Sequence, residues 1–168
     1  MIKISAISAC FIFAVICTAA TSAQTLTGEM ATLQYLVGTW DCSVDSMQPT
    51  GGMQHQNGTL TFAVAPTNTL SQAITSPMFS LSGFLGYSGQ LSKYFSNTTD
   101  SMGGVSASTA DRGTPGRTIF MGNVTMGAQT APSRETDEKL SDTKIHHVGE
   151  VNVGGNWTKV VDATCTKR

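Results

Sequence analysis

Charged residues are scarce in this sequence of 168 residues, since Asp, Glu, Lys and Arg make up only 12% of it. A protein that binds nucleic acid needs Lys and Arg to neutralise phosphates, and no basic stripe is present. We therefore predict no nucleic-acid partner. Without Lys3, nine basic and eleven acidic residues give a formal charge of −2, so the polar surface must come from Ser, Thr, Asn, Gln and Gly.

Long apolar runs are also missing, except at the N-terminus, where "ISAISACFIFAVICTAA" follows Lys3. This run is short for a membrane span. Small residues at Thr21 and Ala23 fit a signal-peptidase site before Gln24. We predict that residues 1–23 are a signal peptide, that the protein is periplasmic or secreted, and that no segment attaches it to a membrane after cleavage. An uncleaved anchor helix is the competing interpretation.

Cysteine becomes rare once the leader is removed, because Cys10 and Cys17 leave with it and only Cys42 and Cys165 stay. In an oxidising compartment a lone pair usually forms a disulfide, which here would join the start of the domain to its end. A zinc site would need further Cys or His at ligand spacing, and the sequence offers none. We predict the disulfide and no metal site.

Strand-like alternation fills the rest of the chain. A helical lead-in is expected over residues 24–34, and from Leu36 the period changes to two, with Trp40 turned inward. Short strands follow with turn signals every 8 to 12 residues, among them Asn57-Gly58 and the chain break "TAPSR". A disulfide between the first and last strands would make them neighbours. We therefore predict an all-β, antiparallel up-and-down barrel over residues 35–168.

The ends of the domain carry a family resemblance. "LVGTWDC" and "ATCTKR" resemble the termini of uncharacterised exported bacterial lipocalin-like proteins, which begin with Leu-x-Gly-Thr-Trp-x-Cys and end with Thr-Cys-Thr-Lys/Arg. The segment "GYSGQLSKYFSNTTDSMGG" is similar to their middle, so the resemblance runs from about Leu33 to Arg168. It implies a lipocalin-like, calycin-type barrel. These proteins have no established activity that the resemblance could transfer.

The resemblance also implies how the barrel closes. Gly38 and Trp40 match the lipocalin Gly-x-Trp motif, in which the tryptophan packs across the barrel bottom under a basic residue. Lys159, Lys167 and Arg168 are the candidates for that residue. Avidin-like proteins also open with Gly-Thr-Trp, but several tryptophans line their biotin site and this chain has two. Nitrobindin-type haem barrels need a proximal histidine that no motif identifies here, and we predict no cofactor.

Two groups of candidate metal ligands have structural interpretations that we favour. Neighbours on a strand point to opposite faces, so His146 and His147 are not expected to chelate one ion together. Met47, Met53 and His55 lie in an expected loop and are ligand types that copper carriers use. Eight methionines in a chain of this length also scatter by chance. Neither group changes the prediction of no metal site.

Carboxylates complete the candidate chemistry. Asp100 lies beside two glycines, which favours a carboxylate that caps a loop. Glu135, Asp137 and Glu138 form an acidic cluster that we expect on a solvated face. No Gly-x-Ser-x-Gly motif is present, and nothing marks a Ser, His and Asp as a triad. We name no catalytic residues, and the ligand-binding residues are unknown.

Two functions of different classes fit these observations. The leading hypothesis is an exported, non-catalytic barrel that binds a small apolar or amphipathic molecule among inward-facing Phe, Leu, Val and Met side chains. The alternative is an exported protein-interaction module, such as an inhibitor of a secreted hydrolase, with a packed barrel and a binding loop over residues 46–56. The protein partner would then be unknown. Enzymatic activity has no positive support from the sequence.

Overall fold

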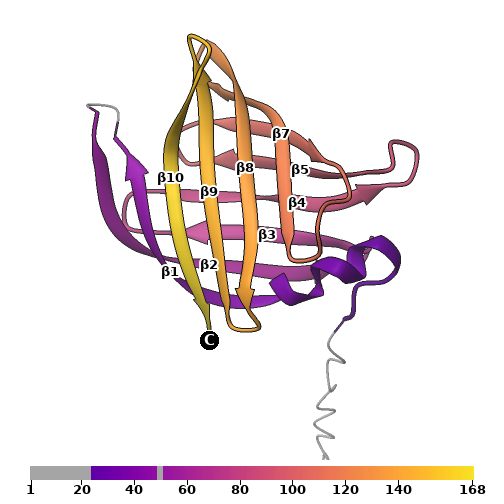
Figure 1. Cartoon of the computed structure of the whole chain (residues 1–168). Coiled ribbons are helices and arrows are strands. Elements are labelled where there is room, and N and C mark those ends of the chain that lie inside the picture. The colour runs from indigo at the N-terminus through magenta and orange to yellow at the C-terminus, as the bar shows by residue number, and fades with distance from the viewer. Residues whose placement is uncertain (1–23, 49–50) are drawn as a thin grey trace, which may run out of the picture.

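Alternation of inward and outward side chains continues around a closed antiparallel β-barrel (Figure 1). The computed structural model describes residues 24–48 and 51–168. The strands of this part are β1 (Gly38–Met47), β2 (Met53–Ala65), β3 (Thr69–Thr75), β4 (Ser80–Ser88), β5 (Lys93–Asp100), β6 (Val105–Ala110), β7 (Arg117–Met126), β8 (Gln129–Ser141), β9 (Lys144–Val153) and β10 (Asn156–Lys167). The all-β, up-and-down barrel prediction is confirmed. The signal peptide at residues 1–23 lies outside the described residues and stays a prediction.

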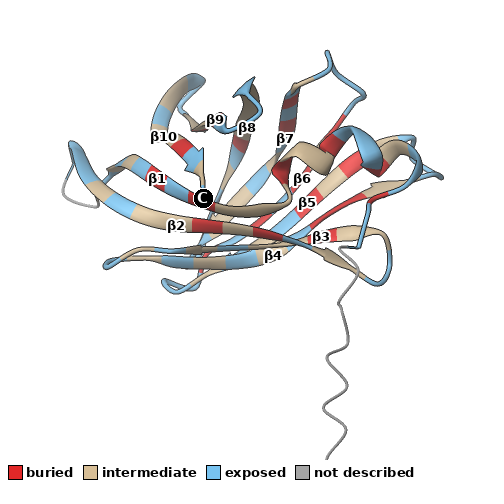
Figure 2. Cartoon of the chain, turned by 90° about the horizontal axis from the view of Figure 1, so that it is seen from below, coloured by how far each residue is buried: buried red, intermediate tan, exposed pale blue. Residues whose placement is uncertain are grey.

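Closure of the barrel comes from the pairing of the first strand with the last. Each strand pairs with its neighbours along the chain, and β1 also pairs with β10. Backbone hydrogen bonds therefore run around the whole described sheet, which removes the exposed edges that an open sheet presents. Viewed from below, buried segments alternate with exposed ones along β1 (Figure 2).

A 3-10 helix, η1 (Gly28–Leu36), covers one end of the barrel. It buries Met30, Leu33 and Leu36, and the hydroxyl of Tyr94 on β5 donates a hydrogen bond of 3.1 Å to the carbonyl of Glu29. The helical lead-in was expected over residues 24–34, so the element exists but lies slightly further along the chain. No helix among the described residues has the length and apolar character needed to cross a membrane.

Trp40 fills the closed end, directly after η1. Its side chain is 0% exposed, and its Nε1 donates a hydrogen bond of 2.8 Å to the Leu36 carbonyl. The Nζ of Lys167 lies 5.1 Å from the ring centroid and also donates to the Tyr35 carbonyl at 3.2 Å. Of the three basic residues that the sequence left open, Lys167 is the one above the ring.

Gly38 makes room for that lysine. Its φ is +132°, a conformation that L-residues rarely adopt, and a Cβ there would lie 2.8 Å from Cε of Lys167. Gly38 and Trp40 thus act as one arrangement, because the glycine admits the lysine that covers the tryptophan.

The disulfide links the two strands that close the barrel. Cys42 on β1 and Cys165 on β10 lie directly opposite each other in the register and are bonded. Both side chains point inward, just above Trp40 in the strand alternation. The predicted disulfide is therefore present, and it connects strands that are 123 residues apart in sequence.

Three local expectations from the sequence were wrong. Asn57-Gly58 lies inside β2 rather than in a turn. The "TAPSR" segment does not break the chain, because Pro132 pairs with β7 at a point where pairing with β9 has not begun. Trp157 was expected on the face of Cys165, but a bulge between Lys159 and Val161 reverses the parity of β10. Trp157 instead contacts Arg134.

Candidate functional site

The barrel interior contains a cavity of about 360 Å³ that reaches the turns at the end opposite η1. Small-molecule sites typically have volumes of about 300 to 1,000 Å³ and a mainly apolar lining with few polar groups. This cavity has both properties. Its apolar lining includes Leu60, Ile74, Phe79, Leu81, Phe120 and Ile145.

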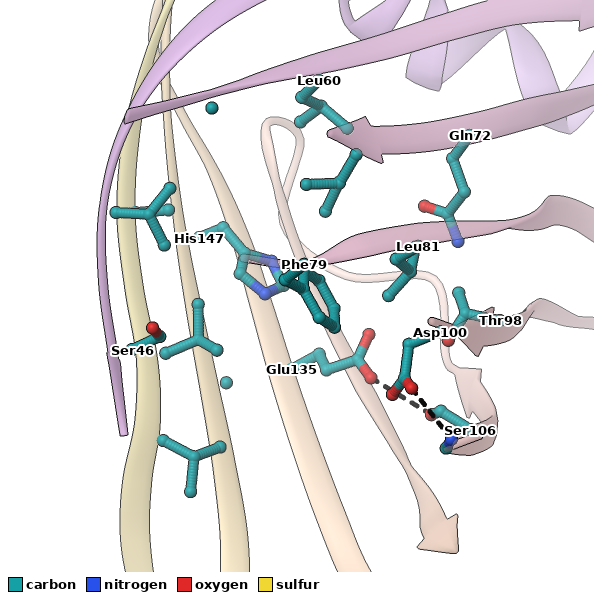
Figure 3. A pocket seen from close by; sticks show the side chains of 18 of the residues that line it. Ser46, Leu60, Gln72, Phe79, Leu81, Thr98, Asp100, Ser106, Glu135 and His147 are labelled. Atoms are coloured by element: carbon teal, nitrogen blue, oxygen red, sulfur yellow. Dashed lines mark hydrogen bonds between the residues drawn. The ribbon is translucent and has the colours of Figure 1, made fainter. Parts of the chain in front are cut away.

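A row of aliphatic side chains crosses three neighbouring strands and forms the apolar wall. Leu60 on β2 lies opposite Ile74 on β3, which lies opposite Leu81 on β4. Residues that are directly opposite on paired strands point to the same face, so all three line the cavity. Phe79 extends the wall into the centre of the site (Figure 3).

Polar side chains from β3, β5, β6 and β8 also line the cavity. Gln72 Nε2 donates a hydrogen bond of 3.2 Å to Ser96 Oγ. Ser106 Oγ donates one of 3.3 Å to an oxygen of Glu135. Figure 3 shows Asp100, Ser106 and Glu135 gathered at one side of the cavity, across from Leu60. The site therefore presents a group of hydrogen-bonding side chains beside and across from the apolar surface.

His147 is the one imidazole that lines the cavity among the described residues. Its Nδ1 lies 2.7 Å from Asp137 Oδ1 on the neighbouring strand. Burial lowers the pKa of His147, but the hydrogen bond to Asp137 and the attraction of Asp137, Glu135 and Asp162 outweigh it and raise the pKa to about 9. His147 is therefore a cation at neutral pH and forms an ion pair with Asp137.

Glu135 lies on the same face of β8 as Asp137, and both line the cavity. Burial raises the pKa of Glu135, the Asp137 charge raises it further, and the His147 cation and the Ser106 hydrogen bond oppose these effects. The expectation of a solvated acidic cluster was wrong for these two residues. Successive side chains on a strand point to opposite faces, so Glu135 and Asp137 line the cavity whereas Glu138 does not.

His146 points away from the cavity, as expected for the neighbour of His147. Its Nε2 lies 2.7 Å from Asp162 Oδ1. The two histidines therefore have separate carboxylate partners and do not converge on one ion.

Met47 and Met53 face each other across the β1–β2 ladder, while His55 Nδ1 lies 3.0 Å from Asp45 Oδ1. In the part of the chain that the structure describes, no three His, Cys, Asp or Glu side chains are grouped to hold a metal ion.

Asp100 caps the β5–β6 turn at the mouth of the cavity. Its Oδ1 accepts hydrogen bonds from the backbone N–H of Met102 at 2.8 Å and of Gly104 at 2.9 Å. The loop-capping interpretation of Asp100 is confirmed.

Exposed methionines line the mouth of the cavity: Met47, Met78, Met102 and Met126. Thioether side chains adapt to varied shapes, so this rim suits the passage of apolar groups.

Sequence reasoning missed the polar side chains that line the cavity. Gln72, Ser96, Ser106 and Ser133 carried no motif, and each became part of the site only through its inward parity on a strand. The sequence does indicate that Ser133 and Glu135 share a face, because they are two residues apart on one strand. The direction of that face, inward or outward, requires the strand pairing that only the structure supplies.

Comparison with known proteins supports the fold and leaves the function open. Neither a protein-family model nor a curated protein matches the chain. Among solved structures, Rv2717c from M. tuberculosis is similar with a TM-score of 0.70 and 12% identity, over 85% of this chain and 99% of that one. At this identity the likeness shows a shared barrel fold.

Two other solved structures align with weaker geometry. EF1p2_mFAP2b bound to DFHBI has a TM-score of 0.40 and 14% identity, over 84% of this chain and 100% of that one. A protein with unknown function from Nostoc punctiforme has a TM-score of 0.25 and 8% identity, over 85% of this chain and 100% of that one. Likeness at these scores carries no argument about this chain.

Proposed function

We propose that this protein is an exported, non-catalytic, lipocalin-like barrel that binds a small apolar or amphipathic molecule in its interior. The observation that carries the proposal is the cavity of about 360 Å³, whose lining is mainly apolar and includes a group of polar side chains. A protein whose barrel served only as a scaffold for loops would gain stability from a filled core. The hollow interior therefore supports ligand binding over the alternative of a packed interaction module.

Export rests on two observations. Residues 1–23 have the pattern of a leader, with the mature chain starting at Gln24. The Cys42–Cys165 disulfide is typical of proteins in oxidising compartments. We propose a periplasmic or secreted location, which N-terminal sequencing of the protein from fractionated cells tests directly.

Binding is tested with a variant that fills the cavity. Ile74→Trp places an indole in the apolar wall, whereas Ala73→Trp places the same group on the exposed outer face of the same strand. Native mass spectrometry of protein purified from its host should show a bound small molecule in the wild type and in Ala73→Trp. A polarity-sensitive dye should bind these two proteins and bind Ile74→Trp at least about tenfold more weakly.

Equal dye binding by Ile74→Trp and the wild type, together with no co-purified mass, would contradict the proposal. Circular dichroism of both variants establishes that each is folded, so a loss of binding in Ile74→Trp reports on the cavity. A variant that removes residues 48–52 distinguishes the two functions. It should bind the dye inside the barrel as the wild type does, whereas a protein partner that binds through this loop would be lost.

A further inference from the structure

The charges that line the cavity are almost all of one sign. Asp100, Glu135 and Asp137 supply three carboxyl groups, and His147 supplies the one basic group among the described residues. Neither Lys nor Arg contributes to the lining among the described residues. A ligand that enters this cavity therefore meets an excess of acidic groups.

Two of the three carboxyl groups already have strong partners. Asp137 lies 2.7 Å from His147. Asp100 accepts the two backbone N–H bonds of its turn. The remaining carboxyl group is that of Glu135.

Glu135 receives a single hydrogen bond, from Ser106 Oγ at 3.3 Å, which is a long bond for two oxygen atoms. A buried carboxyl group normally has a cation or several donors beside it. Within the described chain, the one cation that acts on Glu135 is His147, whose Nδ1 already pairs with Asp137, and the one side-chain donor is Ser106. The side chain therefore has unused capacity to accept hydrogen bonds.

Two further polar atoms of the lining lack partners. Ser133 is two residues from Glu135 on the same face of β8, is only 4% exposed, and its Oγ makes no hydrogen bond with any described residue. Gln56 Oε1, also buried, is unpaired in the same sense. Unpaired buried polar atoms are rare in native proteins and cost free energy unless a ligand or water completes them.

Resting on the function proposed above, we propose that the ligand is an amphipathic organic cation, an alkyl or aryl amine, whose ammonium group binds Glu135 and the adjacent serine hydroxyls. An ammonium group carries three donors, which match the carboxylate of Glu135 and the hydroxyls of Ser106 and Ser133. The apolar body of the ligand packs against the Leu60, Ile74 and Leu81 wall. The chain thus selects its ligand by the sign of the headgroup charge.

The same lining disfavours a carboxylate ligand such as a fatty acid. A second carboxylate beside Glu135 brings like charges together in a site without Lys or Arg, and His147 is already paired with Asp137. Specificity of this kind comes as much from repulsion of the wrong headgroup as from attraction of the right one.

The test uses three probes that share one chain and differ in headgroup: octylamine, octan-1-ol and octanoate. Their affinities for the full purified protein are measured at neutral pH by displacement of a neutral, polarity-sensitive dye. We expect octylamine to bind about tenfold or more tightly than octan-1-ol, and octanoate to bind more weakly than the alcohol.

Glu135→Gln should abolish the preference for octylamine and leave the affinity for octan-1-ol within about twofold. Glu138→Gln is the matched control, because it removes a carboxylate from the same strand outside the cavity and should leave all three affinities unchanged. Ser133→Ala provides a second test, with an expected loss of a few-fold for octylamine alone, should Glu135→Gln fail to fold.

The outcomes separate this inference from the proposed function. If the dye and octan-1-ol bind but octylamine has no advantage, or octanoate binds best, the cationic ligand is overturned while the binding function stands. If neither the dye nor any of the three probes binds the wild type, the proposed function fails and the inference fails with it. An octylamine preference that persists in Glu135→Gln also overturns the inference.

Discussion

The two ends of the barrel are built on opposite principles. At the closed end, Trp40 is fully buried, Lys167 covers it and the Cys42–Cys165 bond joins the adjacent strands. At the open end, methionines are exposed around a hollow interior in which Glu135 has one weak partner. We infer that the closed end supplies much of the stability of the barrel, so that the open half can remain hollow for the ligand proposed above.

The largest effect should come from the tryptophan of the closed end. Trp40→Ala removes a side chain that is 0% exposed, so we expect a loss of about 4 kcal/mol in the free energy of unfolding. Trp157→Ala is the control, since that tryptophan lies on the outer face against Arg134 and its loss should cost less than about 1 kcal/mol. Urea denaturation followed by circular dichroism measures both.

Comparable losses in the two variants would break the distinction between the ends, because stability would then be spread over the whole barrel. A Trp40→Ala protein that fails to fold would agree with the prediction, provided that Trp157→Ala folds normally.

The disulfide is the next largest contribution. Replacing Cys42 and Cys165 together by Ala frees a loop of 123 residues in the unfolded chain, and we expect a loss of about 3 kcal/mol. The melting temperature of the double variant should fall by about 10 °C. Dye binding by the folded fraction should persist, since the mouth and Glu135 lie at the other end. A double variant that melts with the wild type would show that β10 is held to β1 by its hydrogen bonds alone.

The two ends also differ in how far the sequence predicts them. Gly38, Trp40 and Cys42 lie within five residues of one another, and the resemblance of the chain's ends to lipocalin-like proteins together with the lone cysteine pair predicted how this end closes. The choice of Lys167 over Lys159 or Arg168 required the strand register, which places Lys167 opposite Trp40. Local pattern indicated most of the strands, although it put a turn inside β2 and a break inside β8. Long-range pairing was needed to identify the partners.

The cavity was beyond the reach of sequence patterns for a related reason. Glu135 and Asp137 have the composition of a solvated cluster, and only their inward parity on β8 makes them part of a cavity wall. Trp157 shows the converse error, because one bulge in β10 moved it from the expected inner face to the outer one. Along a regular strand, alternate residues face inward, so one inward residue determines the orientation of all the others. A bulge that the sequence does not reveal reverses this assignment for the residues beyond it.

His147 provides a test of the open half through pH. Its pKa is raised from 6.5 to about 9 in the folded protein, so folding favours the protonated form. The resulting stability is fully present below pH 6.5 and is lost as the pH rises through 9. The His147 side chain is 28% exposed, so solvent weakens its electrostatic interactions. We therefore expect the free energy of unfolding to decrease by only about 2 kcal/mol across this interval.

His147→Gln should flatten this decrease, whereas His146→Gln, on the outer face, should leave most of it. The measurement is the free energy of unfolding by urea at a series of pH values from 6 to 10. An unchanged pH dependence in His147→Gln would mean that the buried ion pair with Asp137 does not form.

The smallest effect concerns the lysine over Trp40. Lys167→Met keeps a long apolar stem but removes the charge 5.1 Å from the indole centroid and the hydrogen bond to the Tyr35 carbonyl. We expect a loss of about 1 kcal/mol, because a cation–π contact at a partly desolvated site contributes on that scale. Lys144→Met, at an exposed position on β9, is the control and should change stability by less than about 0.5 kcal/mol. If Lys167→Met were neutral while Trp40→Ala was severe, burial of the tryptophan alone would stabilise the closed end. Glycine would then be needed at position 38 for its backbone conformation and not to make room for the lysine.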